Sequence, residues 1–80
     1  MAIKILFFGI LSSKTGTKET TAEVSGAATP LSDIIKELKE RFPELPDGPF
    51  IYAVNEEQVA TSHNIKDGDE IAIMPPFAGG

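Results

Sequence analysis

The sequence contains no cysteine and only one histidine, His63. No disulfide can cross-link the chain, and a zinc site built from cysteine and histidine lacks its ligands. The absence of cysteine also gives no sign of an oxidising compartment. A chain of 80 residues is one small domain that buries only about 60% of its unfolded surface. We therefore expect apolar packing alone to hold the fold together.

Basic residues are scarce, and no apolar run is long. Twelve Asp and Glu outnumber seven Lys and Arg, which gives a formal net charge of -5. Nucleic-acid binding needs clustered positive charge, so the composition argues against nucleic acid as a partner. The N-terminal apolar run, residues 3–11, contains Lys4, is too short to span a bilayer and lacks a small-residue cleavage site. We expect a cytoplasmic protein that does not enter a membrane.

The sequence also lacks the groupings that ordinary catalysis and cofactor binding require. His63 lies in the polar segment TSHNIKDGD, and nothing nearby predicts a third group that would orient it as a base. The segment DGDE, residues 67–70, has one aspartate before its glycine, whereas calcium loops place acidic residues at alternate positions. We interpret this segment as a turn and His63 as an exposed loop residue. No metal and no bound cofactor are predicted.

Alternating patterns predict strands towards both ends of the chain. Residues 2–9 place Ile3, Ile5 and Phe7 on one face and Lys4, Leu6 and Phe8 on the other. The polar residues 10–18 are expected to form a loop, and residues 19–25 a second, exposed strand of a hairpin. Further strands are predicted over residues 50–55 and 70–75, with a short one over residues 56–60.

One helix is predicted between residues 29 and 43. Thr29 is placed as the N-cap, Pro30 as the first helical residue, and Pro43 after the end. Apolar residues recur at helical spacing, at Leu31, Ile34, Ile35, Leu38 and Phe42. A single apolar stripe buries one side, so the helix is expected to cross a sheet. The element order predicts an α+β fold with a mixed sheet of four to five strands. It is compatible with a β-grasp (ubiquitin-like) fold and equally with a ferredoxin-like fragment.

Three apolar residues are predicted to lie on the sheet face opposite the helix: Leu6, Phe8 and Met74. One helix cannot cover both faces, so these side chains predict a docking surface. The alternatives are that loops cover them or that the strand register differs by one residue.

The sequence finishes on PPFAGG. Pro75 and Pro76 stop the last strand, and Phe77 to Gly80 can extend about 13 Å. Because glycine has no Cβ, such a segment can enter a narrow slot. We expect a domain over residues 1–76 and an extended, flexible tail over residues 77–80. Its terminal carboxylate could react only if activated, for example as an acyl adenylate made with ATP. The alternative is a frayed end without function.

Three segments together resemble a known family: IKILFFG, AVNEEQVA and DGDEIAIMPPFAGG. They are similar to the small subunits of molybdopterin synthase, which are ubiquitin-like sulfur carriers. The resemblance covers nearly the whole chain, is strongest over residues 53–80, and is poor over residues 11–29. It implies a β-grasp fold.

The resemblance also implies a mechanism. Gly80, next to Gly79, is adenylated and converted to a thiocarboxylate, whose sulfur goes to the cyclic pyranopterin precursor of molybdopterin. ATP is consumed by a ubiquitin-activating-like adenylyltransferase, and a sulfur donor supplies the sulfur. The implied partner is the large subunit, in a heterotetramer of two small and two large subunits, so this chain is not catalytic alone. The implied partner-binding residues are Pro75, Pro76, Phe77 and Ala78, together with Leu6, Phe8 and Met74.

Other functions share the same activated terminus. The chain could carry sulfur for thiazole synthesis or tRNA thiolation, or it could be a ubiquitin-like modifier joined through Gly80 to lysines of other proteins. A plain binding module is a further alternative. The sequence does not distinguish molybdenum from tungsten or identify the sulfur donor.

Overall fold

The computed structural model describes residues 2–23, 29–46 and 49–76. Within them the elements, in chain order, are β1 (Ala2–Phe7), α1 (Ile10–Thr15), β2 (Glu19–Glu23), β3 (Thr29–Pro30), α2 (Leu31–Arg41), β4 (Ile51–Val54), β5 (Glu57–Val59), β6 (Asn64–Ile65) and β7 (Glu70–Met74).

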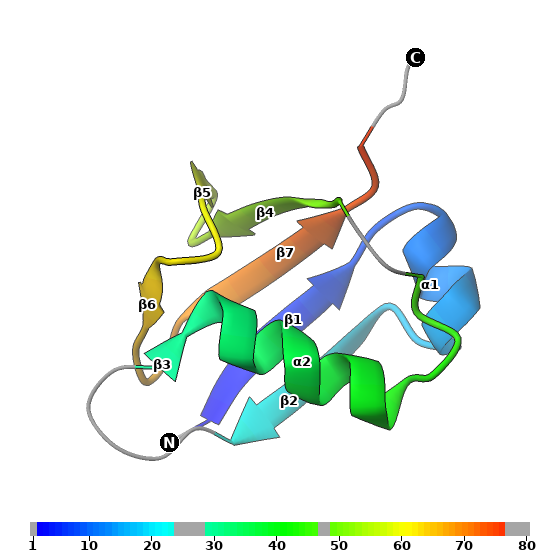
Figure 1. The fold of residues 1–80 in the computed structure, drawn as a ribbon, viewed down its shortest axis with the longest axis horizontal. Coiled ribbons are helices and arrows are strands. Elements are labelled where there is room, and N and C mark those ends of the chain that lie inside the picture. The colour runs from blue at the N-terminus through cyan, green and yellow to red at the C-terminus, as the bar shows by residue number, and fades with distance from the viewer. Residues whose placement is uncertain (1, 24–28, 47–48, 77–80) are drawn as a thin grey trace.

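The main sheet has five strands in the order β2-β1-β7-β4-β5 (Figure 1). β1 and β7, the first and last strands, pair in parallel at its centre, and the other neighbours pair antiparallel. β3 and β6 form a separate two-stranded sheet that lies near one end of α2. The predicted hairpin of β1 and β2 and the mixed five-stranded sheet are confirmed.

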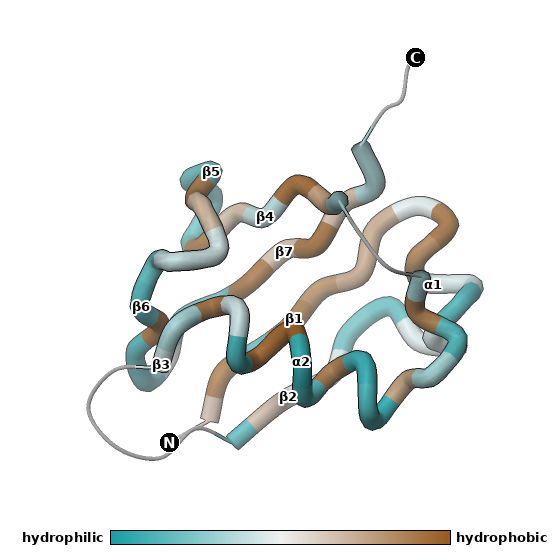
Figure 2. Tube along the Cα trace, in the orientation of Figure 1, coloured by the Kyte–Doolittle hydropathy of each residue, from teal (hydrophilic) through white to brown (hydrophobic). Residues whose placement is uncertain are grey.

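α2 crosses one face of the main sheet (Figure 1). Leu31, Ile34 and Leu38 recur at helical spacing and are at most 1% exposed, and hydrophobic and hydrophilic segments alternate along α2 (Figure 2). The helix begins one residue later than predicted. Pro30 occupies the N-cap, and Thr29 instead pairs with Ile65 in the small sheet.

The core lies between α2 and the facing side of the sheet. Ile3, Ile5 and Phe7 of β1 and Ile71 and Ile73 of β7 are at most 4% exposed, as their alternation predicts. Each such side chain contributes roughly 1.5–3 kcal/mol by leaving water. The ring of Phe7 also meets Phe42 at the end of α2 edge-on, with centroids 5.5 Å apart.

The expectation that residues 10–18 form a loop is wrong. Residues 10–15 form the short helix α1, which is anchored by Leu11 at 1% exposure. Gly16 ends it in the left-handed conformation, with φ of 80°, and its N–H donates to the Ser12 carbonyl. That conformation favours glycine. A helix with one buried side chain shows no apolar periodicity, so the sequence pattern could not predict it.

The turn before β7 is stabilised by a buried carboxylate. Asp69 is 8% exposed, and its Oδ2 accepts the Lys66 backbone N–H at 2.8 Å, while its Oδ1 accepts Asn55 Nδ2 at 3.0 Å. The Glu70 N–H donates to Asn55 Oδ1 at 3.1 Å. Asn55, at φ of 53°, lies in the β4–β5 turn. This network therefore ties two turns that are distant in sequence, a role beyond the simple turn predicted for residues 67–70.

His63 is exposed, as predicted, and its carbonyl accepts the Leu31 N–H at the start of α2. In the described part of the chain, no helix has the length and apolar character needed to cross a membrane. Among the same residues, no group of three or more His, Cys, Asp and Glu is placed to hold a metal ion.

We expect Asp69 to make the free energy of unfolding decrease at acidic pH. Burial raises the pKa of the Asp69 carboxyl, but the hydrogen bonds from Lys66 and Asn55 and the nearby positive charges outweigh it, so the pKa lies below its usual value of 3.8. A depressed folded pKa contributes stability above the unfolded value and loses it as the pH falls through the folded one. Asp69→Asn should therefore lower the free energy of unfolding at neutral pH and flatten its fall below about pH 4.

Urea denaturation of both chains across the acidic range measures this. Asp33→Asn, at an exposed site in the first turn of α2, changes the net charge equally and is the control. Equal acid sensitivity of Asp69→Asn and the wild type would contradict the assignment.

Candidate functional site

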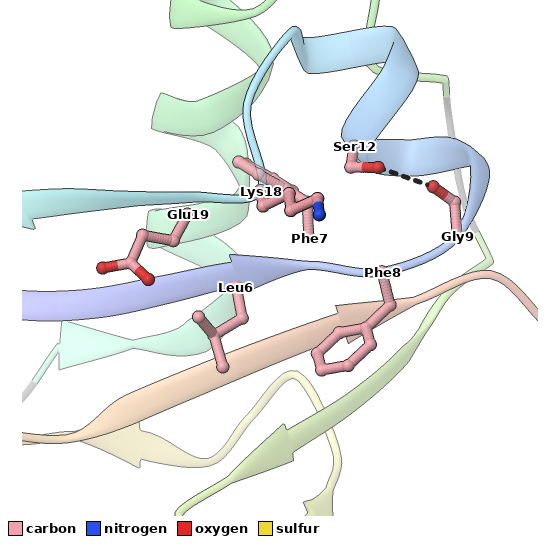
Figure 3. Close-up of a pocket in the computed structure, with 7 residues that line it drawn as sticks. All are labelled: Leu6, Phe7, Phe8, Gly9, Ser12, Lys18 and Glu19. Atoms are coloured by element: carbon pink, nitrogen blue, oxygen red, sulfur yellow. Dashed lines mark hydrogen bonds between the residues drawn. The ribbon is translucent and has the colours of Figure 1, made fainter.

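The sheet face turned away from α2 carries an apolar group at one end. Strand register places Leu6 beside Ala72, Ala72 beside Ala53, and Met74 beside Ile51. Phe8 follows β1 on the same side as Leu6, and both side chains point away from α2 (Figure 3). We call this group the outer-face patch; it consists of Leu6, Phe8, Ile51, Ala53, Ala72 and Met74.

The outer-face patch is partly open to solvent. Phe8 is 45% exposed, and Leu6, Met74 and Ile51 are half-buried by their neighbours. Ile10, the first residue of α1, is 58% exposed and follows Phe8 closely in the chain. Large apolar side chains gathered on one accessible face are typical of an interaction surface. Among the described residues, no helix or loop is packed over Phe8 as the alternative prediction required.

The opposite end of the same face is charged. Lys4 Nζ lies 3.9 Å from Glu19 Oε2 and 3.9 Å from Glu70 Oε2, and all three side chains are substantially exposed. Exposed pairs of this kind contribute little to stability. Lys4 and Glu70 therefore form a charged region near the start of β1, whereas Glu19 lies beside Leu6 at the border of the apolar end.

A hollow of about 320 Å³ adjoins Leu6 and Phe8 (Figure 3). Gly9 and Ser12 line it at the start of α1, with the Ser12 hydroxyl donating to the Gly9 carbonyl at 2.9 Å. Lys18 and Glu19 line it from the β2 side. The apolar end of the face is therefore indented beside Phe8.

β7 ends at Met74, at this same apolar end (Figure 1). Pro75 is half-buried and Pro76 is exposed. The other predicted site residues, Phe77, Ala78, Gly79 and Gly80, lie outside the described residues, as does the proposed tail over residues 77–80. Of the predicted site, the structure thus brings together Leu6, Phe8, Met74 and Pro75.

Titratable groups do not gather in the outer-face patch. Burial raises the pKa of the Tyr52 hydroxyl, but Tyr52 pairs with Ile73 on the core face of the sheet. Asp69 belongs to the turn network described above. The outer-face patch itself therefore offers apolar contact.

Ile51 and Ala53 also belong to the patch, although they were not predicted from the sequence. They occupy alternate positions with Tyr52 and Val54, and Val54 is 5% exposed in the core. Once Val54 is assigned to the core, period-2 alternation alone places Ile51 and Ala53 outward. The signal was present, but the four-residue strand IYAV is apolar on both faces.

A family model matches this chain over residues 5–80, and its description is the ThiS family. The chain belongs to the ThiS family. A curated relative, the molybdopterin synthase sulfur carrier subunit of Chlamydomonas reinhardtii, is 35% identical over 85 residues that cover all of both chains.

Solved structures share the fold of this ThiS-family chain. The putative molybdopterin converting factor subunit 1 of Pyrococcus furiosus superposes with a TM-score of 0.85 and 23% identity, covering 96% of this chain and 99% of that one. A chain in the complex of subunits 1 and 2 of the molybdopterin-converting factor of Helicobacter pylori gives 0.73 and 24%, with both chains fully covered. The fold is the ubiquitin-like β-grasp, which removes the ferredoxin-like alternative.

Phe7, the last residue of β1, and Phe8, which follows it, should respond differently to truncation. Phe7→Ala removes a ring that is 4% exposed and should cost about 3–5 kcal/mol of unfolding free energy. Phe8→Ala, at 45% exposure, should cost about 1 kcal/mol or less. Chemical denaturation of the two variants tests which face is buried, and equal losses would show that Phe8 belongs to the core.

Proposed function

We propose that this chain is a sulfur carrier that acts as the small subunit of molybdopterin synthase. The observation that carries the proposal is the 35% identity, along the whole of both chains, to a molybdopterin synthase sulfur carrier subunit. The family match also extends through residue 80, so it includes the terminal Gly79-Gly80 pair.

The reacting group is the Gly80 carboxylate. Its oxygen attacks the α-phosphate of ATP, and pyrophosphate leaves to give an acyl adenylate. A sulfur donor then displaces AMP at the carbonyl carbon, which leaves a thiocarboxylate. The thiocarboxylate sulfur bonds to the cyclic pyranopterin precursor, and water then hydrolyses the bond between that sulfur and the Gly80 carbonyl carbon. The sulfur stays on the precursor and the carboxylate is restored, so the chain can be charged again. Two such transfers build the dithiolene that holds molybdenum or tungsten.

The outer-face patch is the docking surface in this proposal. Met74 ends β7 within the patch, so a partner that covers Phe8 and Met74 also holds the point from which residues 75–80 continue. The proposed partners are a large subunit, in a heterotetramer of two small and two large subunits, and a ubiquitin-activating-like adenylyltransferase. The structure of a complex between subunits 1 and 2 of a molybdopterin-converting factor supports a large subunit as partner.

The side chains of this chain indicate which functions it performs and which belong to the large subunit. The patch offers apolar contact, and His63 is an exposed loop residue whose carbonyl accepts the Leu31 N–H at the start of α2. General acid and base groups and the pterin pocket therefore belong to the large subunit. ATP is consumed by the activating enzyme, so this chain binds no cofactor of its own.

Deleting Gly80 should abolish sulfur transfer. The deletion moves the terminal carboxylate back by one residue, and Gly79→Val adds a branched side chain where the segment must enter a narrow site. Intact mass spectrometry after incubation with ATP, the activating enzyme and a sulfide source should show one oxygen replaced by sulfur in the wild type alone.

The control for this experiment is the free energy of unfolding, which should hardly change in either variant. Thiocarboxylate formation by the shortened chain would contradict the proposal. Formation of the thiocarboxylate without molybdopterin synthesis by the large subunit would favour carriage for thiazole or tRNA thiolation. Isopeptide-linked conjugates to lysines would favour the modifier function.

Phe8→Asp should weaken binding to the large subunit while the fold is kept. A carboxylate at the centre of the patch must lose water on docking without a partner charge, which is costly. Ser32→Asp adds the same charge at an exposed position on α2, across the sheet, and should bind normally. Calorimetric titration measures both affinities, and circular dichroism checks helix content. Wild-type affinity for Phe8→Asp would exclude the patch as the docking surface.

A further inference from the structure

Gly9 has a backbone conformation that is closed to other residues. It follows β1 and caps the start of α1 with φ of 60° and ψ of -136°. These angles mirror the extended conformation that L-residues prefer, so any side chain there is strained. Gly16, at the other end of α1, also has a positive φ of 80°, but it lies in the common left-handed region.

Gly9 is held in place from both sides. Before it, the Phe8 N–H donates to the Ile73 carbonyl at 3.1 Å and so continues the pairing of β1 with β7. After it, the backbone N–H and the hydroxyl of Ser12 both donate to the Gly9 carbonyl, at 3.2 and 2.9 Å. Leu11, buried at 1% exposure, fixes α1 beneath this turn. The turn therefore has little freedom to move.

Pro75 lies against this turn. A Cβ on Gly9 would sit 3.4 Å from Pro75 Cγ and 3.6 Å from its Cδ, which is contact distance. The space holds at most one methyl group, and a larger side chain must displace the proline ring. Pro75 directly follows β7 and is half-buried, while Pro76 is exposed.

We propose that Gly9 is a positioning residue for sulfur transfer: it braces Pro75 and so sets the direction of the chain at Pro76. This inference rests on the proposed function. The same turn carries Phe8, so the docking side chain and the base of the terminal segment are held in one fixed relation. Proline adds to this because its own φ is fixed, which transmits the direction of residue 75 to the next residue.

The test compares Gly9→Val with Gly16→Val. Both place valine at a positive φ in a cap of α1, but a Cβ at Gly16 meets nothing within 4 Å. With saturating large subunit, the thiocarboxylated Gly9→Val chain should transfer sulfur about a hundredfold more slowly, because misplacing reacting groups by about 1 Å can cost that much. Its affinity for the large subunit should stay close to that of the wild type. Gly16→Val should transfer at the wild-type rate.

Two further measurements separate bracing from damage to the fold. Pro75→Ala removes the ring, so Gly9→Val combined with Pro75→Ala should be less impaired than the two single effects added together. Nuclear Overhauser contacts between the Gly9 α-protons and the Pro75 ring should appear in the wild type and Gly16→Val and vanish in Gly9→Val.

The inference is overturned if Gly9→Val transfers as fast as Gly16→Val, if the effects at positions 9 and 75 simply add, or if the wild type shows no Gly9–Pro75 contact. If the wild type shows the contact but transfers no sulfur to the precursor, the proposed function is wrong. The role of Gly9 in transfer is then wrong as well.

Discussion

The parallel pairing of β1 with β7 is the constraint on which the rest of this molecule depends. It joins the two ends of the sequence at the centre of the sheet, with Lys4 to Phe7 beside Glu70 to Ile73. The other strands of the five-stranded sheet, β2, β4 and β5, are added to one side or the other of this pair. Because parallel strands run in the same direction, they also finish at the same edge. Phe8 and Pro75 therefore lie together, although 66 positions separate them in the sequence.

This arrangement places an accessible apolar surface beside the end of β7 in a small acidic domain. The body supplies a defined surface next to the point where the chain leaves it. The apolar end of the outer face lies beside that point, and Lys4 and Glu70 lie towards the other end of the face. A partner that buries the apolar end is therefore oriented with respect to the terminal segment.

Much of the fold could be predicted from the sequence because its patterns are strong. Alternation in the first strand predicts that Ile3, Ile5 and Phe7 are buried. Helical spacing predicts the same of Leu31, Ile34 and Leu38, and all six are buried in the structure. The failures arise where tertiary contacts override local pattern. α1 depends on a single buried residue, Leu11, and Thr29 pairs with Ile65 rather than capping α2. The Asp69 network joins turns that no local pattern connects.

The outer-face patch shows the same difference between residues with a clear local pattern and residues without one. Leu6, Phe8 and Met74 were predictable because each alternates with residues that are clearly core. Ile51 was not, since it lies in a short strand that is apolar on both faces. The contact of Gly9 with Pro75 has no sequence signal, because it depends on where β1 and β7 end in space.

Odd-numbered and even-numbered positions along β1 have different roles: one set stabilises the core, and the other forms a surface that a partner can contact. Its odd-numbered residues, up to Phe7, fill the core, and its even-numbered residues, from Lys4 to Phe8, form the accessible face. A slip of one residue would exchange the two sets, and the burial of Ile3, Ile5 and Phe7 opposes that slip strongly. The outer face can therefore change its side chains to suit a partner at little cost to the fold. Gly9 lies where this alternation ends, and there the need for a fixed exit direction replaces the need for burial.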